Sequence, residues 1–220
     1  AIDSKNPRTA DRSLPAGRLS RRYAWFVTVG AAVVFILAAA MLNPVCLVLA
    51  IPTLAVLLGY SYAKRFTSAA HLWLGFALGI APIGAWIAVT GTIDAPAVVL
   101  GAAVTFWVAG FDTIYSLQDE SFDRSHGLQS LPARFGPRGA LVIARLLHVF
   151  ALIGFAAFAV AAGGGWIRMA AVAAAALLML WQHRLVRADD LSAVDAAFFT
   201  ANGALSVLMC FLFIVAKLIG

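Results

Sequence analysis

Charged residues are scarce in this 220-residue chain, at 12% of the composition, while hydrophobic residues make up 63%. The charged share is about half that of an ordinary soluble domain, so the chain cannot bury its apolar side chains in one water-soluble core. The composition therefore excludes a soluble globular enzyme, and it also excludes intrinsic disorder, a collagen-like repeat and a disulfide-rich secreted scaffold. The two cysteines, Cys46 and Cys210, lie inside apolar blocks and carry no information on the redox compartment.

Long apolar blocks take the place of the missing polar surface. Seven of them are long enough, or nearly so, to cross a hydrocarbon layer, which needs about 20 helical residues. Lipid offers the backbone no water partner, and these blocks do not alternate like the strands of an outer-membrane barrel. We therefore predict an all-α integral membrane protein with seven transmembrane helices. The predicted spans are 23–42, 45–63, 72–91, 95–116, 139–162, 166–182 and 197–218.

The connections between these spans alternate in charge. Residues 1–22, 64–71, 117–138 and 183–196 hold 13 of the 16 lysines and arginines, whereas the intervening connections hold none. The positive-inside rule places the charged connections on the cytoplasmic side, which predicts a multi-pass protein of the cell inner (cytoplasmic) membrane. Basic residues spread over short connections do not form the single basic face of a nucleic-acid-binding protein. Acids contribute little to orientation, so acids in the same connections indicate chemistry at that face.

One acidic segment leaves the cytoplasmic end of the fourth span, with the sequence Asp112-Thr-Ile-Tyr115-Ser-Leu-Gln-Asp119-Glu-Ser-Phe-Asp123. At 100° per residue the three aspartates and Tyr115 fall on one stripe about 80° wide, provided that the helix continues. Like charges on one helix face are destabilising, and an acid at membrane depth is costly. A hard divalent ion held by carboxylates and substrate phosphates, as Mg²⁺ usually is, would compensate them.

Other interpretations of this segment stay open. The acids could form a solvated cap that pairs with Arg124, Arg134 or Arg138. Tyr115 taken alone is typical of an interfacial aromatic residue, whereas on the acidic stripe its hydroxyl could orient a substrate.

Two basic segments lie in the cytoplasmic connections. In the first, residues 1–18, arginine side chains follow Asn6-Pro7 and are suited to gripping phosphate oxygens. In the second, residues 60–67, Lys64 and Arg65 add a second cationic contact to a diphosphate. The alternatives are contact with anionic lipid for the first segment and topological anchoring for the second. The four histidines do not cluster at any metal spacing, and we interpret those near span ends as interfacial residues without a role.

Three separated segments resemble the UbiA superfamily of intramembrane aromatic prenyltransferases, and in particular its 4-hydroxybenzoate polyprenyltransferase-like members. They read IDSKNPRTADRSLPAGRLS, then YSYAKRFT with the following HLWLGFALGIAPIGAWIAV, then DTIYSLQDESFDRSHGLQSLPARFG. The resemblance implies a nine-helix bundle with two aspartate-rich motifs and Mg²⁺ bridging them to a prenyl diphosphate. It also implies transfer of the polyprenyl group to an aromatic acid, 4-hydroxybenzoate, in ubiquinone biosynthesis.

The resemblance also implies roles for individual residues. Asp119 and Asp123 match the metal-binding acids of the second motif, and Asp112 and Tyr115 match the catalytic pair that precedes them. Of the first motif, N-x-x-x-D-x-x-x-D, only the final acid is present, as Asp3, which is the third expected metal ligand. The residues expected to bind the diphosphate are Asn6, Arg8, Arg12, Lys64 and Arg65. We expect residues 1–220 to be a single transmembrane domain that lacks the first two helices of the family.

Two alternative functions stay open. The sequence of the second aspartate motif is equally compatible with prenylation of a naphthoate or another quinone precursor in menaquinone biosynthesis. From a different class, acids in membrane spans suit a cation-coupled transporter, although no chain of ionisable groups continues to the other side. A noncatalytic scaffold would explain the spans but not the acidic stripe. The expected partners are the polyprenyl diphosphate, the aromatic acid and membrane lipid, without nucleic acid.

Overall fold

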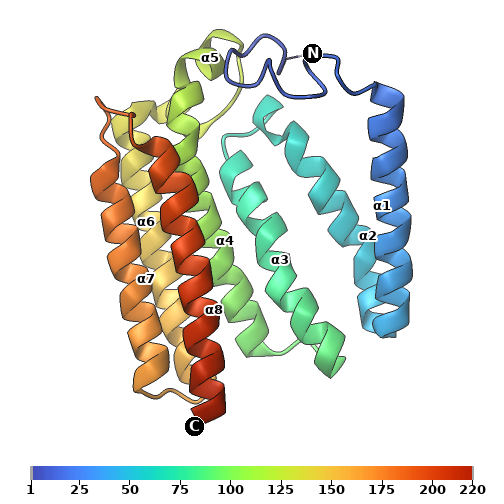
Figure 1. The fold of residues 1–220 in the computed structure, drawn as a ribbon, viewed down its shortest axis with the longest axis vertical. Coiled ribbons are helices and arrows are strands. Elements are labelled where there is room, and N and C mark those ends of the chain that lie inside the picture. Colours follow the sequence, from blue (N-terminus) through green and yellow to red (C-terminus); the bar gives the residue numbers. More distant parts are fainter. Residues whose placement is uncertain (1, 220) are drawn as a thin grey trace.

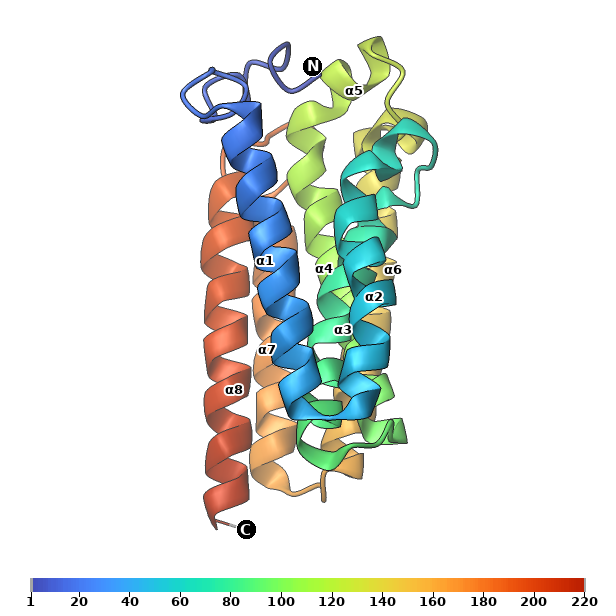
Figure 2. The same cartoon turned by 90° about the vertical axis from the view of Figure 1, so that its right-hand side faces the viewer.

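Seven long helices run side by side along the molecule (Figures 1 and 2) in the computed structural model, which describes residues 2–219. Each is long and apolar enough to cross a membrane, so the seven predicted spans are confirmed. No β-strand occurs between residues 2 and 219, and the predicted all-α fold is confirmed as well. The elements are α1 (Arg21–Leu42), α2 (Pro44–Gly59), η1 (Tyr60–Arg65), α3 (Ala70–Thr90), α4 (Ala95–Tyr115), η2 (Ser116–Asp119), α5 (Glu120–Ser125), α6 (Leu131–Ala161), α7 (Trp166–Leu185), η3 (Ala196–Thr200) and α8 (Ala201–Ile219).

The helices α3 and α4 occupy the middle of the bundle. Helices α1 and α2 lie on one side of them, and α6, α7 and α8 lie on the other (Figure 1). The N-terminal loop, residues 2–20, crosses the same end of the molecule as α5, whereas the chain finishes at the opposite end (Figures 1 and 2). The segments that carry the predicted site therefore meet at one end.

Polar caps set the starts of several helices. Ser20 accepts a hydrogen bond from the Tyr23 amide at the start of α1, and Ser130 accepts one from the Ala133 amide at the start of α6. Asn43 caps α2 with its side-chain oxygen and donates from Nδ2 to the Ile87 carbonyl of α3 at 2.8 Å. These side chains satisfy backbone groups that a helix terminus leaves unpaired, which is obligatory in an apolar surrounding.

Small residues allow α3 and α4 to approach closely. A Cβ atom added at Gly75 would lie 2.2 Å from the Thr105 carbonyl oxygen, and one added at Gly79 would lie 2.5 Å from the Gly101 carbonyl oxygen. On the next face of α4, a Cβ atom at Gly110 would lie 2.3 Å from the His148 ring of α6. Van der Waals contact of this kind drives association between helices in lipid, where water supplies no hydrophobic force. Tight packing therefore holds α3, α4 and α6 together below the end of the bundle that carries the site.

Two helix boundaries differ from the prediction. The fourth helix does not continue as an α-helix to Asp123, because the 3₁₀ turn η2 separates α4 from α5. The fifth span, α6, begins at Leu131 rather than at 139, with a kink at Gly136 whose φ of 70° requires glycine. The apolar pattern could not predict this start, because the residues before the kink are mixed in polarity. Their helix begins at the Ser130 cap.

Candidate active site

Asp119 is the most densely bonded carboxylate at the loop end of the bundle. It is 4% exposed and lies at the end of η2. Asn6 donates from Nδ2 to Oδ1 at 2.9 Å, and Arg8 donates from Nε to the same oxygen at 2.9 Å. The Arg8 fork is completed by a 2.5 Å hydrogen bond from Nη2 to Oδ2. The hydrogen bond to this carboxylate raises the pKa of the Arg8 guanidinium above its ordinary value, so this cation stays charged.

Asp123 is held by a different cation from a different segment. It is 2% exposed, in the first turn of α5, and its Oδ2 accepts from Nζ of Lys64 at 3.0 Å. Lys64 lies in η1, and its backbone oxygen accepts a hydrogen bond from the Gln129 amide at 2.6 Å. Nearby, Arg134 donates to the Ser68 hydroxyl at 3.0 Å. The segment that carries Lys64 is thus bonded to the segment after α5 independently of Asp123.

The solvated cap considered from the sequence is wrong, since both acids are buried and pair with Arg8 and Lys64. Of the arginines proposed for that cap, Arg124 instead pairs with Glu120 at 2.6 Å on the surface of α5.

Tyr115 joins the basic loop to a row of aromatic side chains. Its hydroxyl accepts from Arg8 Nη1 at 3.2 Å, and the guanidinium carbon lies 5.0 Å from its ring centre. The ring stacks on Phe198 at 4.0 Å, and Phe198 contacts Phe111, which contacts Trp107 in turn. Phe198 belongs to the single π-helical turn η3, whose Ala197 carbonyl accepts from the buried Gln182 side chain at 2.7 Å. A π-type turn of this sort often marks a functional site.

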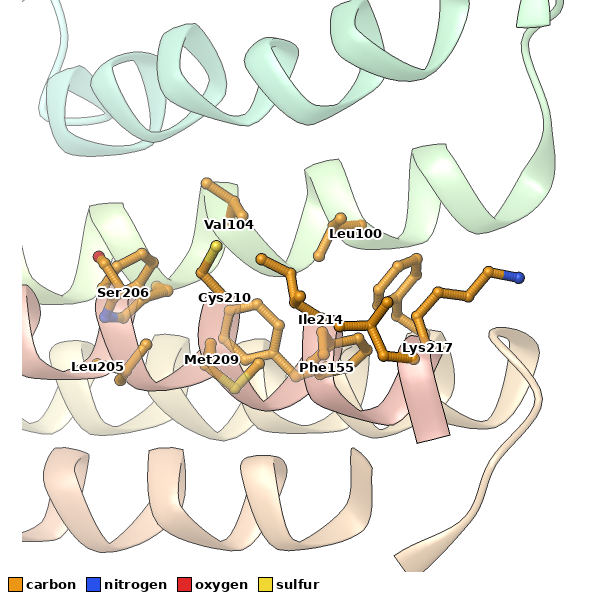
Figure 3. Close-up of a pocket in the computed structure, with 13 residues that line it drawn as sticks. Leu100, Val104, Phe155, Leu205, Ser206, Met209, Cys210, Ile214 and Lys217 are labelled. Carbon is orange, nitrogen blue, oxygen red and sulfur yellow. The ribbon is translucent and has the colours of Figure 1, made fainter. Parts of the chain in front are cut away.

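An apolar cleft continues from this aromatic row. It has a volume of about 610 Å³ and lies between α4, α6 and α8 (Figure 3). Its walls include Trp107 and Leu100 from α4, Phe155 from α6 and Met209 and Phe213 from α8. The cleft extends along α8 toward its C-terminal end, away from the acids, so it is an apolar extension of the site and not the place where charged groups react.

Asp112 and His71 form a pair that the sequence interpretation missed. Nδ1 of His71 lies 2.7 Å from Oδ2 of Asp112, and the His71 ring is completely buried. The interpretation of span-end histidines as interfacial is therefore wrong for His71, and equally for His148, which is 2% exposed. A signal was available, because His71 begins one span and Asp112 nears the end of the next. Antiparallel neighbours place such residues at the same membrane level.

Besides Asp112, which pairs with His71, three predicted residues lie outside the bonded cluster. The side chains of Asp3, Arg12 and Arg65 are exposed, and the Arg65 guanidinium lies over the Tyr62 ring at 5.0 Å. The structure brings together the other six predicted site residues, which are Asn6, Arg8, Lys64, Tyr115, Asp119 and Asp123.

The buried acids have the donor chemistry for a hard divalent cation. Within residues 2–219 no three acidic, histidine or cysteine side chains lie together as a ready-made metal site. Mg²⁺, however, is usually bound by one or two carboxylates, with waters and substrate phosphates as the other ligands. Asp119 and Asp123 supply two carboxylates one helical turn apart, and they therefore fit an ion that binds together with a diphosphate.

Comparison with known sequences gives a consistent set of relatives. A sequence model of the UbiA prenyltransferase family matches residues 1–212. A 4-hydroxybenzoate octaprenyltransferase of Aromatoleum aromaticum is 30% identical over 208 residues, which are 94% of this chain and 70% of that protein. A 4-hydroxybenzoate solanesyltransferase of Synechocystis is 37% identical over 139 residues, 61% of this chain and 46% of that protein.

Solved structures share the fold. The apo structure of a UbiA homolog from Aeropyrum pernix K1 superposes with a TM-score of 0.88 at 38% identity, covering 98% of this chain and 80% of that one. A structure of digeranylgeranylglyceryl phosphate synthase gives a TM-score of 0.71 at 19% identity, covering 97% and 76%. At that lower identity the second likeness concerns the fold alone.

Proposed function

The chain belongs to the UbiA prenyltransferase family, and on this basis we propose that it transfers a polyprenyl group from a polyprenyl diphosphate to 4-hydroxybenzoate in ubiquinone biosynthesis. The observation that carries the proposal is the pairing of two buried acids with cations from two separate segments, next to an apolar cleft. Such a site offers acids for a metal, cations for a diphosphate and an apolar surface for an isoprenoid chain. The relatives named as 4-hydroxybenzoate polyprenyltransferases support the choice of acceptor.

The polar end of the site would bind the diphosphate. Asp119 and Asp123 would hold Mg²⁺, which when bound supplies positive charge next to the departing diphosphate. Arg8 presents a planar fork that matches phosphate oxygens bidentately, and Lys64 presents a point charge. Both lie within hydrogen-bond distance of the acids, so their side chains need only small movements to reach a diphosphate bound at the same place.

The chemistry follows from charge. The C1–O bond of the prenyl diphosphate breaks, and the oxygen keeps the electron pair while C1 gains allylic cation character. An electron-rich ring carbon of the aromatic acid attacks C1, and the ring then loses a proton to the released diphosphate. Arg8 and Lys64 stabilise the charge that develops on the leaving group. The aromatic rings of Tyr115 and Phe198 lie beside Arg8, and aromatic rings of this kind attract a cation.

The apolar end would accommodate the prenyl chain. Trp107 belongs both to the aromatic row that starts at Tyr115 and to the wall of the cleft, so a continuous apolar surface links the two. An isoprenoid chain that lies in the cleft and extends into lipid keeps its charged head at the acids. We propose that this end faces the cytoplasm from the inner membrane, because the basic connections gather there.

The direct test is transfer by the full-length protein reconstituted in lipid vesicles. The assay supplies radiolabelled polyprenyl diphosphate, Mg²⁺ and equal amounts of 4-hydroxybenzoate and a dihydroxynaphthoate. We expect prenylated 4-hydroxybenzoate, and its loss when the metal is chelated. Product formed from the naphthoate alone would replace the proposal with the menaquinone alternative. Cation flux across the vesicles without any product would favour a transporter.

A further inference from the structure

His71 is the most completely enclosed ionisable side chain around α4, and both of its ring nitrogens are engaged. It lies in the first turn of α3 and is 0% exposed. Nδ1 faces Oδ2 of Asp112 on α4 at 2.7 Å. On the other side of the ring, the backbone amide of Leu131, the first residue of α6, donates to Nε2 at 3.4 Å. One imidazole thus links three helices.

These two partners fix the position of the ring proton. A backbone N–H can only donate, so Nε2 must be the accepting nitrogen. The proton of the ring consequently lies on Nδ1, where it is donated to the Asp112 carboxylate. Histidine tautomers are commonly selected by the hydrogen bond that the other nitrogen makes, and here the selecting partner is the start of α6.

The hydrogen bond holds Asp112 by a single oxygen. Oδ2 is occupied by His71, whereas Oδ1 has no partner in the part of the chain between residues 2 and 219. The Asp112 side chain is 21% exposed. The next two side chains of α4, those of Thr113 and Ile114, are buried. Asp112 lies seven residues before Asp119, which corresponds to about 10 Å along the helix axis at the α-helical rise. Its unpaired oxygen is therefore close to the polar end of the site but separate from the acids bound to cations.

We propose that His71 is a positioning residue for the reaction, which holds Asp112 in one rotamer so that its Oδ1 accepts a hydrogen bond from the substrate. This inference rests on the proposed function. The Leu131 amide selects the His71 tautomer that carries its proton on Nδ1. This Nδ1–H group donates to the Asp112 carboxylate and so fixes its orientation. A group supported in this way stays within the narrow geometric tolerance that catalysis requires.

Two conservative substitutions separate this role from simple helix packing. His71→Asn keeps an N–H near the position of Nδ1, whereas His71→Gln keeps an acceptor near the position of Nε2. A positioning role predicts that His71→Asn retains turnover within about threefold of the wild type, while His71→Gln loses about tenfold or more in kcat. The KM for the polyprenyl diphosphate should change less than kcat in both variants, since Arg8 and Lys64 are untouched.

A packing role predicts the reverse ranking, because His71→Gln would keep the bond to α6. Equal turnover of the two variants, or a better His71→Gln enzyme, would overturn the proposal. His71→Ala serves as the limiting case: if it is folded by circular dichroism and retains wild-type kcat, the proposal is also wrong.

A spectroscopic readout keeps the inference testable without any turnover. Protein labelled with ¹⁵N-histidine should show for His71 a protonated Nδ1 and an unprotonated Nε2, with the signal assigned by its loss in His71→Asn. Asp112→Ala should leave that tautomer in place, because the Leu131 amide that selects it is untouched. A ring protonated on Nε2 would overturn the inference. Wild-type protein that shows the expected tautomer but prenylates no acceptor would instead refute the proposed function.

Discussion

Asp119 and Asp123 stand one turn apart, yet their surroundings are built differently. Asp119 accepts three hydrogen bonds from Asn6 and Arg8, which belong to the N-terminal loop. Asp123 accepts one from Lys64, whose own segment is fixed by backbone and side-chain bonds to the segment after α5. We therefore expect docking of the loop to depend on Asp119, and the position of the Lys64 segment not to depend on Asp123.

The difference shows how one site can combine a cation from a loop with a cation from a helix. The Arg8 side chain comes from a loop of tight turns, such as the one closed by the Thr9 amide and the Asn6 carbonyl at 3.0 Å. It is therefore held at the site by its own side-chain hydrogen bonds and not by a helix. Lys64 extends from a 3₁₀ helix that continues α2, and only its flexible side chain is free to move.

The largest expected effect is on turnover, where the two acids should be alike. Asp119→Asn and Asp123→Asn each remove a charged oxygen ligand from the proposed metal and diphosphate site. We expect kcat to fall about 100-fold or more in each variant, since loss of one electrostatic contact to a transition state costs about that much. The measurement is prenyl transfer in vesicles at saturating Mg²⁺. Near-normal turnover in either variant would contradict the assignment of that acid.

The second-largest expected effect is on tryptic cleavage, and it should differ between Asp119 and Asp123. Asp119→Asn removes the charge that holds the Arg8 fork, and charge-assisted hydrogen bonds contribute about 1.5–3 kcal/mol each. We expect tryptic cleavage after the exposed Arg12 and Arg18 to become about tenfold faster in detergent micelles. Asp123→Asn is the matched control and should leave the cleavage rate unchanged. Equal acceleration in both variants would show that the loop does not depend on Asp119 in particular.

The spans and the acids were predictable from the sequence because their signals are local. A block such as residues 95–111 is almost entirely apolar, and Asp119 and Asp123 stand in one short segment. The partners of the acids were not predictable, because Asn6 and Asp119 are 113 positions apart and meet only in the folded bundle. Arg12 and Arg8 look equivalent in the sequence, yet only Arg8 faces the acids.

A smaller effect should distinguish the fork of Arg8 from its charge. Arg8→Lys keeps the positive charge but cannot bond both oxygens of Asp119 and the Tyr115 hydroxyl at once. We expect the KM for the polyprenyl diphosphate to rise about fivefold, with a smaller change in the KM for 4-hydroxybenzoate. Lys64→Arg is the matched exchange at the other acid, and its effect on KM should be weaker because Lys64 makes a single contact. Equal effects of the two exchanges on KM would contradict the expected difference between Arg8 and Lys64.

The smallest effect is expected at Glu120, which lies between the two acids in sequence but faces away from them. Its carboxylate pairs with Arg124 at 2.6 Å, and the Arg124 side chain is 59% exposed. Exposed pairs of this spacing contribute about 0.3–0.5 kcal/mol. Glu120→Gln should therefore keep turnover and tryptic cleavage within about twofold of the wild type. Because this variant removes an acid from the same segment without touching Arg8 or Lys64, a large loss of turnover in it would mean that the total charge of the segment, and not the specific pairing of Asp119 and Asp123, governs the site.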